Sequence, residues 1–525
     1  MPPEPAPLAR RTLVLLLGAA VAIKLAFAAA VPLTGDEAYF LVYARDVDWG
    51  GFYDHPPMVG WLLWLMERVS SHPLVLRLPA IATGLLLPLL VYRLLRPIDA
   101  RRAELAALLL LFTPIWLLFV FVTTDVGVVL FGFLSMLAVH RGNATGGARW
   151  FALGGGLLGL AFLSKYFAVL LGLAYAVHLL IVDRRQWRGF LVLVVVALPF
   201  GLLNLAWNWL HCWDNVMFNV FNRNAGDGVG LAGPAVYAAT LVYLLAFPLW
   251  WLVRQRAAVA AAVRRHRLAL FATVLLAPLA LFAVISLFAG IGLHWLLLFA
   301  PAAHVLYVGI DTAGLRRALA LMVGFAGLHV VLLAALVVPP PSAFDGLDFH
   351  EDAVFYLAPS AFARALPDSG FDFRATDSYS RSAVLGYHDD GYWSVFGTGS
   401  EHARQDDRVT DWRERDGATM LYTEGSGDVP VDELRRYFDR VRVERFELEG
   451  ATFAYAIAQG FDYTRYRATV LTTIRERYYR IPGYLPLGAC AFLERYFPGD
   501  PRVSSRPDDG GPGRACRGGE ADGRS

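Results

Sequence analysis

Long runs of apolar residues fill the first 338 positions of this 525-residue chain, and they constrain its fold more than any other feature. A helix needs about 20 apolar residues to cross the hydrocarbon core of a bilayer. Eleven stretches reach or approach that length: residues 12–33, 74–95, 103–122, 126–140, 150–164, 167–182, 189–207, 232–253, 268–289, 295–310 and 317–338. The sequence therefore predicts a polytopic α-helical membrane protein with about 11 transmembrane helices.

The overall composition excludes several other classes of protein. Hydrophobic residues make up 56% of the chain and charged residues 18%, whereas a soluble protein has about a quarter charged residues. Such a chain cannot cover itself with polar surface, which excludes a water-soluble enzyme and a disordered protein. Three cysteines are too few for a disulfide scaffold, and a net charge of +2 gives no electrostatic case for nucleic-acid binding.

The loop charges predict an orientation. Arginines gather in alternate loops, at Arg10 and Arg11; Arg93, Arg96, Arg101 and Arg102; Arg141 and Arg149; Arg184, Arg185 and Arg188; Arg254, Arg256, Arg264, Arg265 and Arg267; and Arg316 and Arg317. All these clusters fall on one side when eleven spans are counted, and the positive-inside rule makes that side cytoplasmic. We therefore expect a cytoplasmic N-terminus and an outer location for everything after residue 339.

That outer part has a soluble character. Residues 339–500 are charged and mixed, with strand-like runs at 418–422 and 451–457 and a helical pattern at 431–441. We expect a small extracytoplasmic α/β domain there, following a membrane domain of residues 1–338. The last segment, 501–525, is rich in Gly, Pro, Ser, Asp and Arg and is expected to be disordered.

The first outer loop, residues 34–73, carries an acidic pair, Asp36 and Glu37, followed by Tyr39, which is a candidate for substrate contact. Carboxylates at a membrane surface cost desolvation energy and call for a reason. One reason is structural, because Asp is a preferred N-cap for a helix that starts here. The other is chemical: Asp36 could act as a general base with a pKa raised by partial burial. Both can hold together.

The same loop ends in Tyr53-Asp54-His55-Pro56-Pro57, before an apolar segment with Trp61 and Trp64 that suits an interfacial helix. A turn with Pro at the first helical position explains the prolines. It leaves the Asp and His unexplained, so we assign Asp54 and His55 to shaping the substrate site.

A third carboxylate, Asp125, follows Thr124 at the outer end of the fourth span. It can cap that span, or it can join Asp36, Glu37 and His55 in an acid/base or metal-assisted site. A divalent metal ion at these four residues is the weaker of the two chemical interpretations, because no familiar metal-ligand spacing is present.

Lys24 and Lys165 are the only lysines, and Lys165-Tyr166 interrupts about thirty apolar residues. Lys165 can snorkel to the outer surface, or it can bind the anionic head group of a lipid. In a chain with so few lysines we favour the second interpretation. Tyr166, Asn208, Arg223 and His294 are further candidates for substrate contacts, the last with interfacial capping as its alternative.

Taken together, these motifs resemble a known family. The Asp-Glu pair in the first outer loop, Tyr-Asp-His-Pro-Pro, Thr-Asp after the third span, Phe162-Leu163-Ser164-Lys165-Tyr166 and Trp207-Asn208 resemble the bacterial GT-C membrane glycosyltransferases of the protein O-mannosyltransferase and lipid A aminoarabinose transferase-like group. The resemblance covers about residues 12–310. It implies a GT-C fold, and it makes Asp36 the base, Glu37 and Asp125 the accompanying acids, and Lys165 and Arg223 the donor-phosphate ligands.

The resemblance also implies an activity, the inverting transfer of a hexosyl or pentosyl group from a polyprenyl-phosphate donor. The acceptor hydroxyl belongs to a protein, a glycan or a lipid at the outer face of the bacterial cytoplasmic membrane, and the outer tail matches no acceptor-binding domain of the group. The competing interpretation is a lipid or solute transporter or flippase. A transporter would carry its ionisable residues near the bilayer centre. Here they gather at outer span ends, which favours the transferase.

Overall fold

The computed structural model describes residues 10–222 and 232–504, and helices occupy all eleven of the predicted apolar stretches. In that part of the chain, six helices are long and apolar enough to cross a membrane. They are α1 (Arg10–Ala30), α5 (Leu78–Leu95), α8 (Thr124–Thr145), α11 (Trp187–Leu210), α13 (Ala232–Arg254) and α17 (Thr312–Val337). Arg223 and most of the tail predicted to be disordered, 505–525, lie outside the described residues.

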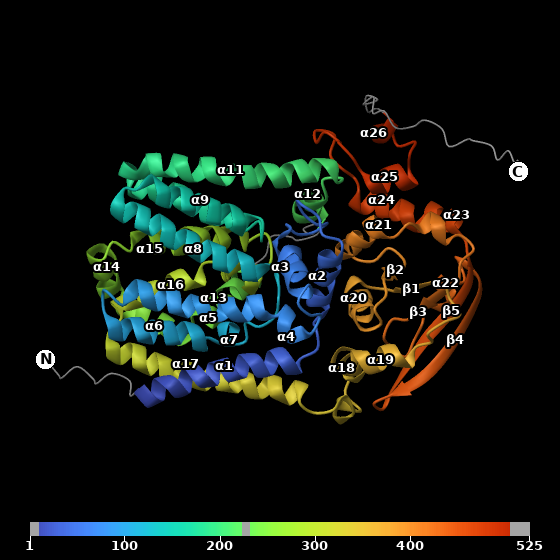
Figure 1. Cartoon of the computed structure of the whole chain (residues 1–525), viewed down its shortest axis with the longest axis horizontal. Helices are drawn as coiled ribbons and strands as arrows, with labels where there is room; N and C mark the ends of the chain where they lie inside the picture. The colour runs from blue at the N-terminus through green and yellow to red at the C-terminus, as the bar shows by residue number, and fades with distance from the viewer. Residues whose placement is uncertain (1–9, 223–231, 505–525) are drawn as a thin grey trace, which may run out of the picture.

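Shorter apolar helices complete the bundle. Figure 1 shows α6 (Ala100–Phe112), α9 (Ala148–Phe162), α15 (Ala269–Ile285) and α16 (Ala300–Leu306). Helix α10 (Ala168–Val177) is a further one. The predicted span 103–122 is broken at Thr113, because a residue before proline is pushed into the extended region, and the short helix α7 (Pro114–Leu117) follows. Eleven crossings therefore remain a prediction.

The outer surface of this bundle is apolar. Large apolar side chains are exposed along one face of α1 (Leu15), of α11 (Val195) and of α17 (Val331). A water-soluble protein does not expose continuous apolar faces of this size, whereas lipid accepts them. The chain is a membrane-embedded, multi-span protein.

A layer of short helices covers one end of the bundle (Figure 1): α2 (Gly35–Arg45), α3 (Met58–Glu67), α4 (Pro73–Leu76) and α12 (Asp214–Val216). Helix α2 starts with a capping box. Thr34 accepts a hydrogen bond from the backbone of Glu37, and the Glu37 carboxylate accepts one from the backbone of Thr34. Thr34, and not Asp36, is therefore the N-cap.

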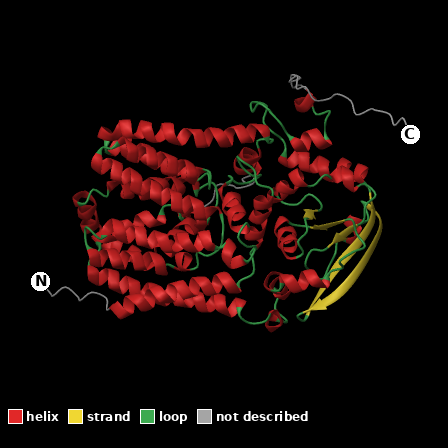
Figure 2. Cartoon of the chain, viewed as in Figure 1, coloured by secondary structure: helices red, strands yellow, loops and turns green. Residues whose placement is uncertain are grey.

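Beyond this layer lies a five-stranded sheet with the order β2-β1-β3-β5-β4, formed by β1 (Phe373–Thr376), β2 (Trp393–Val395), β3 (Met420–Tyr422), β4 (Phe438–Leu448) and β5 (Ala451–Phe461) (Figure 2). Strand β1 is parallel to β2 and β3, and β5 is antiparallel to β3 and β4.

The predicted helix at 431–441 is wrong beyond its first turn. Helix α22 ends at Leu434, and β4 begins at Phe438. Strand β4 pairs with β5 from Phe438 opposite Phe461 to Leu448 opposite Ala451. This pairing outweighs the helical spacing of the apolar residues in 431–441.

Two connections join this sheet region to the membrane part. Helix α20 (Tyr379–His388) packs on α2 (Figure 1). A disulfide between Cys212, just before α12, and Cys490, just before α25 (Ala491–Tyr496), links segments 278 residues apart. The cysteine count gave no hint of this pairing.

Candidate functional site

The first carboxylate of the acidic loop, Asp36, is exposed at the first turn of α2. The hydroxyl of Tyr379, on α20, lies 3.5 Å from its Oδ1 atom. The side chain is therefore accessible, next to a helix N-terminus and a neutral hydroxyl. This is a suitable place for a carboxylate that has to meet an incoming group.

Glu37, the second carboxylate, is buried and fully paired. Its two oxygens accept hydrogen bonds from Arg77 Nε at 2.9 Å and Nη2 at 2.6 Å, and Oε1 also accepts one from the Val122 backbone at 3.0 Å. The guanidinium further donates to the backbone carbonyls of Ala28, Val31 and Pro32. With these partners Glu37 joins α2 to the ends of α1, α4 and α7. This pairing holds Glu37 in place, and its role as an acid that accompanies Asp36 stays a prediction.

Asp125 and Lys165 form a second buried pair, with Lys165 Nζ 2.7 Å from Asp125 Oδ1. Thr123, and not Asp125, caps α8 through its side chain. The Val122 backbone, which donates a hydrogen bond to Glu37, is two residues before the start of α8, so the segment that leads into α8 lies beside the start of α2. Hydrogen bonds connect Glu37 to the segment before Asp125, and Asp125 to Lys165. A single site that contains Asp36, Glu37, Asp125 and Lys165 stays a prediction.

Asp54 is the centre of a third group. It accepts a hydrogen bond from the hydroxyl of Tyr43, and its oxygens lie 2.8 Å from His55 Nδ1 and 3.2 Å from His402 Nδ1. Burial would raise the pKa of Asp54, but the two imidazoles hold that pKa below its usual range. His402 comes from beyond the membrane part, so this group fixes the outer region on the first loop.

Tyr166 and Asn208 lie in an amide network. The Tyr166 hydroxyl bonds to Asn204 at 3.1 Å and to Asn215, and Asn208 accepts a hydrogen bond from the Asn215 backbone at 3.0 Å. Asn215 in turn donates to the carbonyl oxygen of Tyr53 at 3.0 Å. These partners hold the loop that contains Tyr53 on α11. Contact of Tyr166 and Asn208 with substrate stays a prediction.

Two further candidates from the sequence are Tyr39 and His294. The Tyr39 hydroxyl donates to the carbonyl oxygen of His402 at 2.6 Å. His294 is exposed in the short 3₁₀ segment Leu293–Leu296.

The four residues predicted as metal ligands do not point toward a common position. Of the four residues proposed from the sequence, Glu37 faces Arg77, Asp125 faces Lys165, and His55 faces Asp54. Within residues 10–222 and 232–504, no three His, Cys, Asp or Glu side chains are grouped to hold a metal ion. The described residues at this site do not fit a divalent metal ion.

Sequence reasoning missed three contributors: Arg77, Tyr379 and His402. Arg77 carried a usable signal, because it is an arginine at the predicted outer end of a span, where the arginine pattern of the loops predicts few cations. Tyr379 and His402 lie about 340 residues from α2 in sequence, and no local pattern marks them.

Asp214 offers a pH-dependent prediction. It is buried in α12, and its Oδ1 atom has no hydrogen-bond partner among the described residues. Burial, with the charges of Asp407 and Asp48 and against that of Arg408, raises its pKa to about 8. The folded state therefore binds this proton more tightly than the unfolded state, and its stability falls as pH rises from about 4 to 8.

We expect D214N to remove this pH dependence. The Tm of D214N should exceed that of the wild type by a margin that widens between pH 5 and pH 8, by on the order of 5 °C, and then levels off. Thermal unfolding from pH 5 to 9 measures it, with D432N as the control at an exposed carboxylate. Parallel pH profiles for D214N and the wild type would contradict the assignment.

The chain is similar to known membrane proteins. Residues 54–207 match the dolichyl-phosphate-mannose-protein mannosyltransferase family. Lipid A galacturonosyltransferase RgtD from Rhizobium johnstonii is 30% identical over 187 residues, which cover 34% of this chain and 38% of the relative. The chain thus matches little more than a third of that relative's length.

The fold is similar over a longer range. The crystal structure of ArnT from Cupriavidus metallidurans in the apo state has a TM-score of 0.60 at 15% identity, covering 85% of this chain and 98% of ArnT. The same protein bound to undecaprenyl phosphate has a TM-score of 0.59 at 16% identity, with the same coverage. The sequence match is confined to part of the chain, and the shared architecture shows that the chain has the GT-C fold of ArnT.

Proposed function

We propose that this protein is an inverting glycosyltransferase that moves a sugar from a polyprenyl-phosphate donor to an acceptor hydroxyl at the outer face of the membrane. The observation that carries the proposal is the arrangement around the start of α2. Asp36 is exposed in the first turn of α2, and its neighbour Glu37 accepts a hydrogen bond from the Val122 backbone. Val122 is three residues before Asp125, which forms the buried pair with Lys165. The similarity to ArnT, which has been crystallised with undecaprenyl phosphate, supports a lipid-phosphate donor.

The proposed reaction needs one base and one leaving-group stabiliser. The Asp36 carboxylate takes the proton of the acceptor hydroxyl, whose oxygen attacks the anomeric carbon of the donor sugar. A new carbon–oxygen bond forms as the bond from that carbon to the phosphate oxygen breaks. Attack from the face opposite the phosphate inverts the anomeric configuration and releases polyprenyl phosphate.

Lys165 supplies the cation for the departing phosphate. Its ammonium is a compact point charge, held by Asp125 at 2.7 Å and flanked by the Phe167 ring at 5.7 Å. In this water-poor setting a fixed cation stabilises developing phosphate charge more strongly than it would in water. We assign Asp125 to orienting Lys165.

We also propose that residues 1–338 form the catalytic membrane domain, with the N-terminus in the cytoplasm, and that residues 339–500 form an outer domain over the site. The disulfide between Cys212 and Cys490 supports an outer location for both segments, because such bonds persist in oxidising compartments. The acceptor would be a protein, a glycan or a lipid at this face.

The experiment measures sugar transfer from a radiolabelled polyprenyl-phosphate hexose to isolated cell envelopes by membranes with and without this protein. We expect K165A to raise the donor concentration needed for half-maximal rate by about 10–100-fold, the loss of about 1.4–2.8 kcal/mol of phosphate binding. R442A, at an exposed arginine, is the control. An unchanged donor dependence in K165A would refute the phosphate assignment, and no transfer by the wild type with this donor or a pentosyl one would refute the function.

A further inference from the structure

A cavity of about 330 Å³ lies between the membrane part and the outer region. One wall is α2, and the opposite walls are α20, the start of β2 and the segment 403–409, which ends in α21 (Asp406–Val409). This volume is within the range of ligand pockets, roughly 300–1,000 Å³. None of the groups assigned to donor binding lines it.

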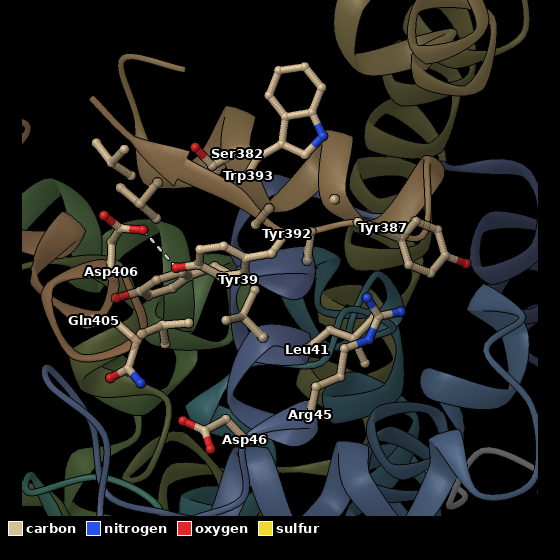
Figure 3. A pocket seen from close by; sticks show the side chains of 18 of the residues that line it. Tyr39, Leu41, Arg45, Asp46, Ser382, Tyr387, Tyr392, Trp393, Gln405 and Asp406 are labelled. Carbon is tan, nitrogen blue, oxygen red and sulfur yellow. Dashed lines mark hydrogen bonds between the residues drawn. The ribbon is translucent and has the colours of Figure 1, made fainter. Parts of the chain in front are cut away.

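The lining combines aromatic rings with a few hydrogen-bonding groups. In Figure 3 the rings of Tyr39 and Tyr392 lie side by side and point toward Asp406 and Gln405. Tyr392 donates a hydrogen bond to Asp406 Oδ1 at 2.7 Å, and Thr410 donates another at 2.8 Å. Aromatic faces beside carboxylate and amide groups suit a sugar, whose C–H faces pack on rings and whose hydroxyls donate to oxygen acceptors.

The charge of the lining argues for an acceptor without phosphate near the bound sugar. Asp46, Asp390 and Asp406 line the cavity, and its one cation, Arg45, is paired with Glu67 at 3.0 Å. Asp46 and Asp390 are exposed at the edge of the cavity and Asp406 is buried, and each of these carboxylates repels another negative charge. A phosphate group would therefore be disfavoured here, whereas a neutral or amino sugar is not.

The cavity is also connected to the proposed base. Tyr379 lines it, and the hydroxyl of the same side chain lies 3.5 Å from Asp36 Oδ1. Tyr39, one turn further along α2 than Asp36, lines it as well. Tyr379 is therefore the side chain that connects the cavity to the Asp36 carboxylate.

From this arrangement we propose that the cavity between α2 and α20 binds the acceptor, and that the acceptor is an unphosphorylated sugar unit of a glycan or glycolipid. The inference rests on the proposed transferase function and adds the acceptor class to it.

The test uses saturation-transfer NMR on the full-length protein in amphipol, which avoids sugar-headed detergents. The probes are methyl β-galactoside and methyl β-glucoside, their 6-phosphates, and a serine-containing tripeptide. V409W fills the cavity from its 39% exposed rim position on α21. V443W places the same side chain at a 38% exposed position on β4, away from the cavity, as the matched control.

We expect one or both methyl hexosides to give a signal at least fivefold stronger than that of their 6-phosphates. This signal should fall at least fivefold in V409W and stay unchanged in V443W. Absence of hexoside binding, equal binding of the phosphates, no effect of V409W, or displacement of the hexoside by the peptide would each overturn the proposal. D36N distinguishes the proposed base from the proposed acceptor cavity, because this variant should bind the hexosides as the wild type does. Full transfer by D36N together with binding sensitive to V409W would overturn the base and leave the cavity assignment standing.

Discussion

D36N is expected to lower the rate of sugar transfer by about 10²- to 10⁴-fold, the usual contribution of a positioned general base. The amide has nearly the shape of the carboxylate but cannot accept the proton of the acceptor hydroxyl. Because Asp36 is exposed and is not the N-cap of α2, its replacement leaves the Thr34 capping box in place. The loss should therefore appear in kcat, with the donor concentration for half-maximal rate little changed.

The measurement is steady-state transfer from a polyprenyl-phosphate sugar by purified protein, together with its Tm. D432N, at a carboxylate 95% exposed on the outer region, should keep both the rate and the Tm. Full activity in D36N at normal expression would remove Asp36 as the base. A loss of activity that is matched by a loss of folded protein would instead make Asp36 a structural residue.

R77M is expected to destabilise the fold by about 3–5 kcal/mol, because it leaves the buried Glu37 carboxylate without its partner. Both side chains are almost completely inaccessible. The guanidinium also satisfies three backbone carbonyls at the end of α1. Its removal therefore loosens the junction of α1, α2 and α4, and we expect little folded protein.

A matched pair of variants makes this result interpretable. R45M breaks the exposed pair between Arg45 and Glu67, and such a pair contributes roughly 0–1 kcal/mol. The double variant R77M/E37M should recover part of the lost Tm, because it removes the unpaired charge. Thermal unfolding followed by size-exclusion chromatography measures all three. Equal Tm values for R77M and R45M would contradict the role given to the buried pair.

The sequence was sufficient for the elements that depend on apolar length. Each of the eleven apolar stretches contains a helix. In lipid the backbone has to satisfy its own hydrogen bonds, and a helix does so within one segment. It was less informative where local pattern and long-range pairing compete. The helical spacing at 431–441 gave way to β4, and Pro114 ended α6 within a predicted span.

The candidate site shows the same limit. Sequence position placed Asp36, Glu37, Asp125 and Lys165 at one face, but it did not distinguish the accessible carboxylate from the two paired ones. That distinction depends on Arg77 and Lys165, each 40 residues from its carboxylate partner. The packing of helices determines which residues pair at such sequence separations. The composition of the two segments does not reveal that packing.

The bond between Cys212 and Cys490 has a consequence for biosynthesis. Its second cysteine is made 278 residues after the first, so the covalent link can close only after Cys490 has left the ribosome. Until then the first thiol must stay reduced, and it must avoid pairing with other proteins. Maturation of this protein is therefore expected to require a thiol-oxidising partner in the receiving compartment, and hosts that lack one should accumulate an open, protease-sensitive form.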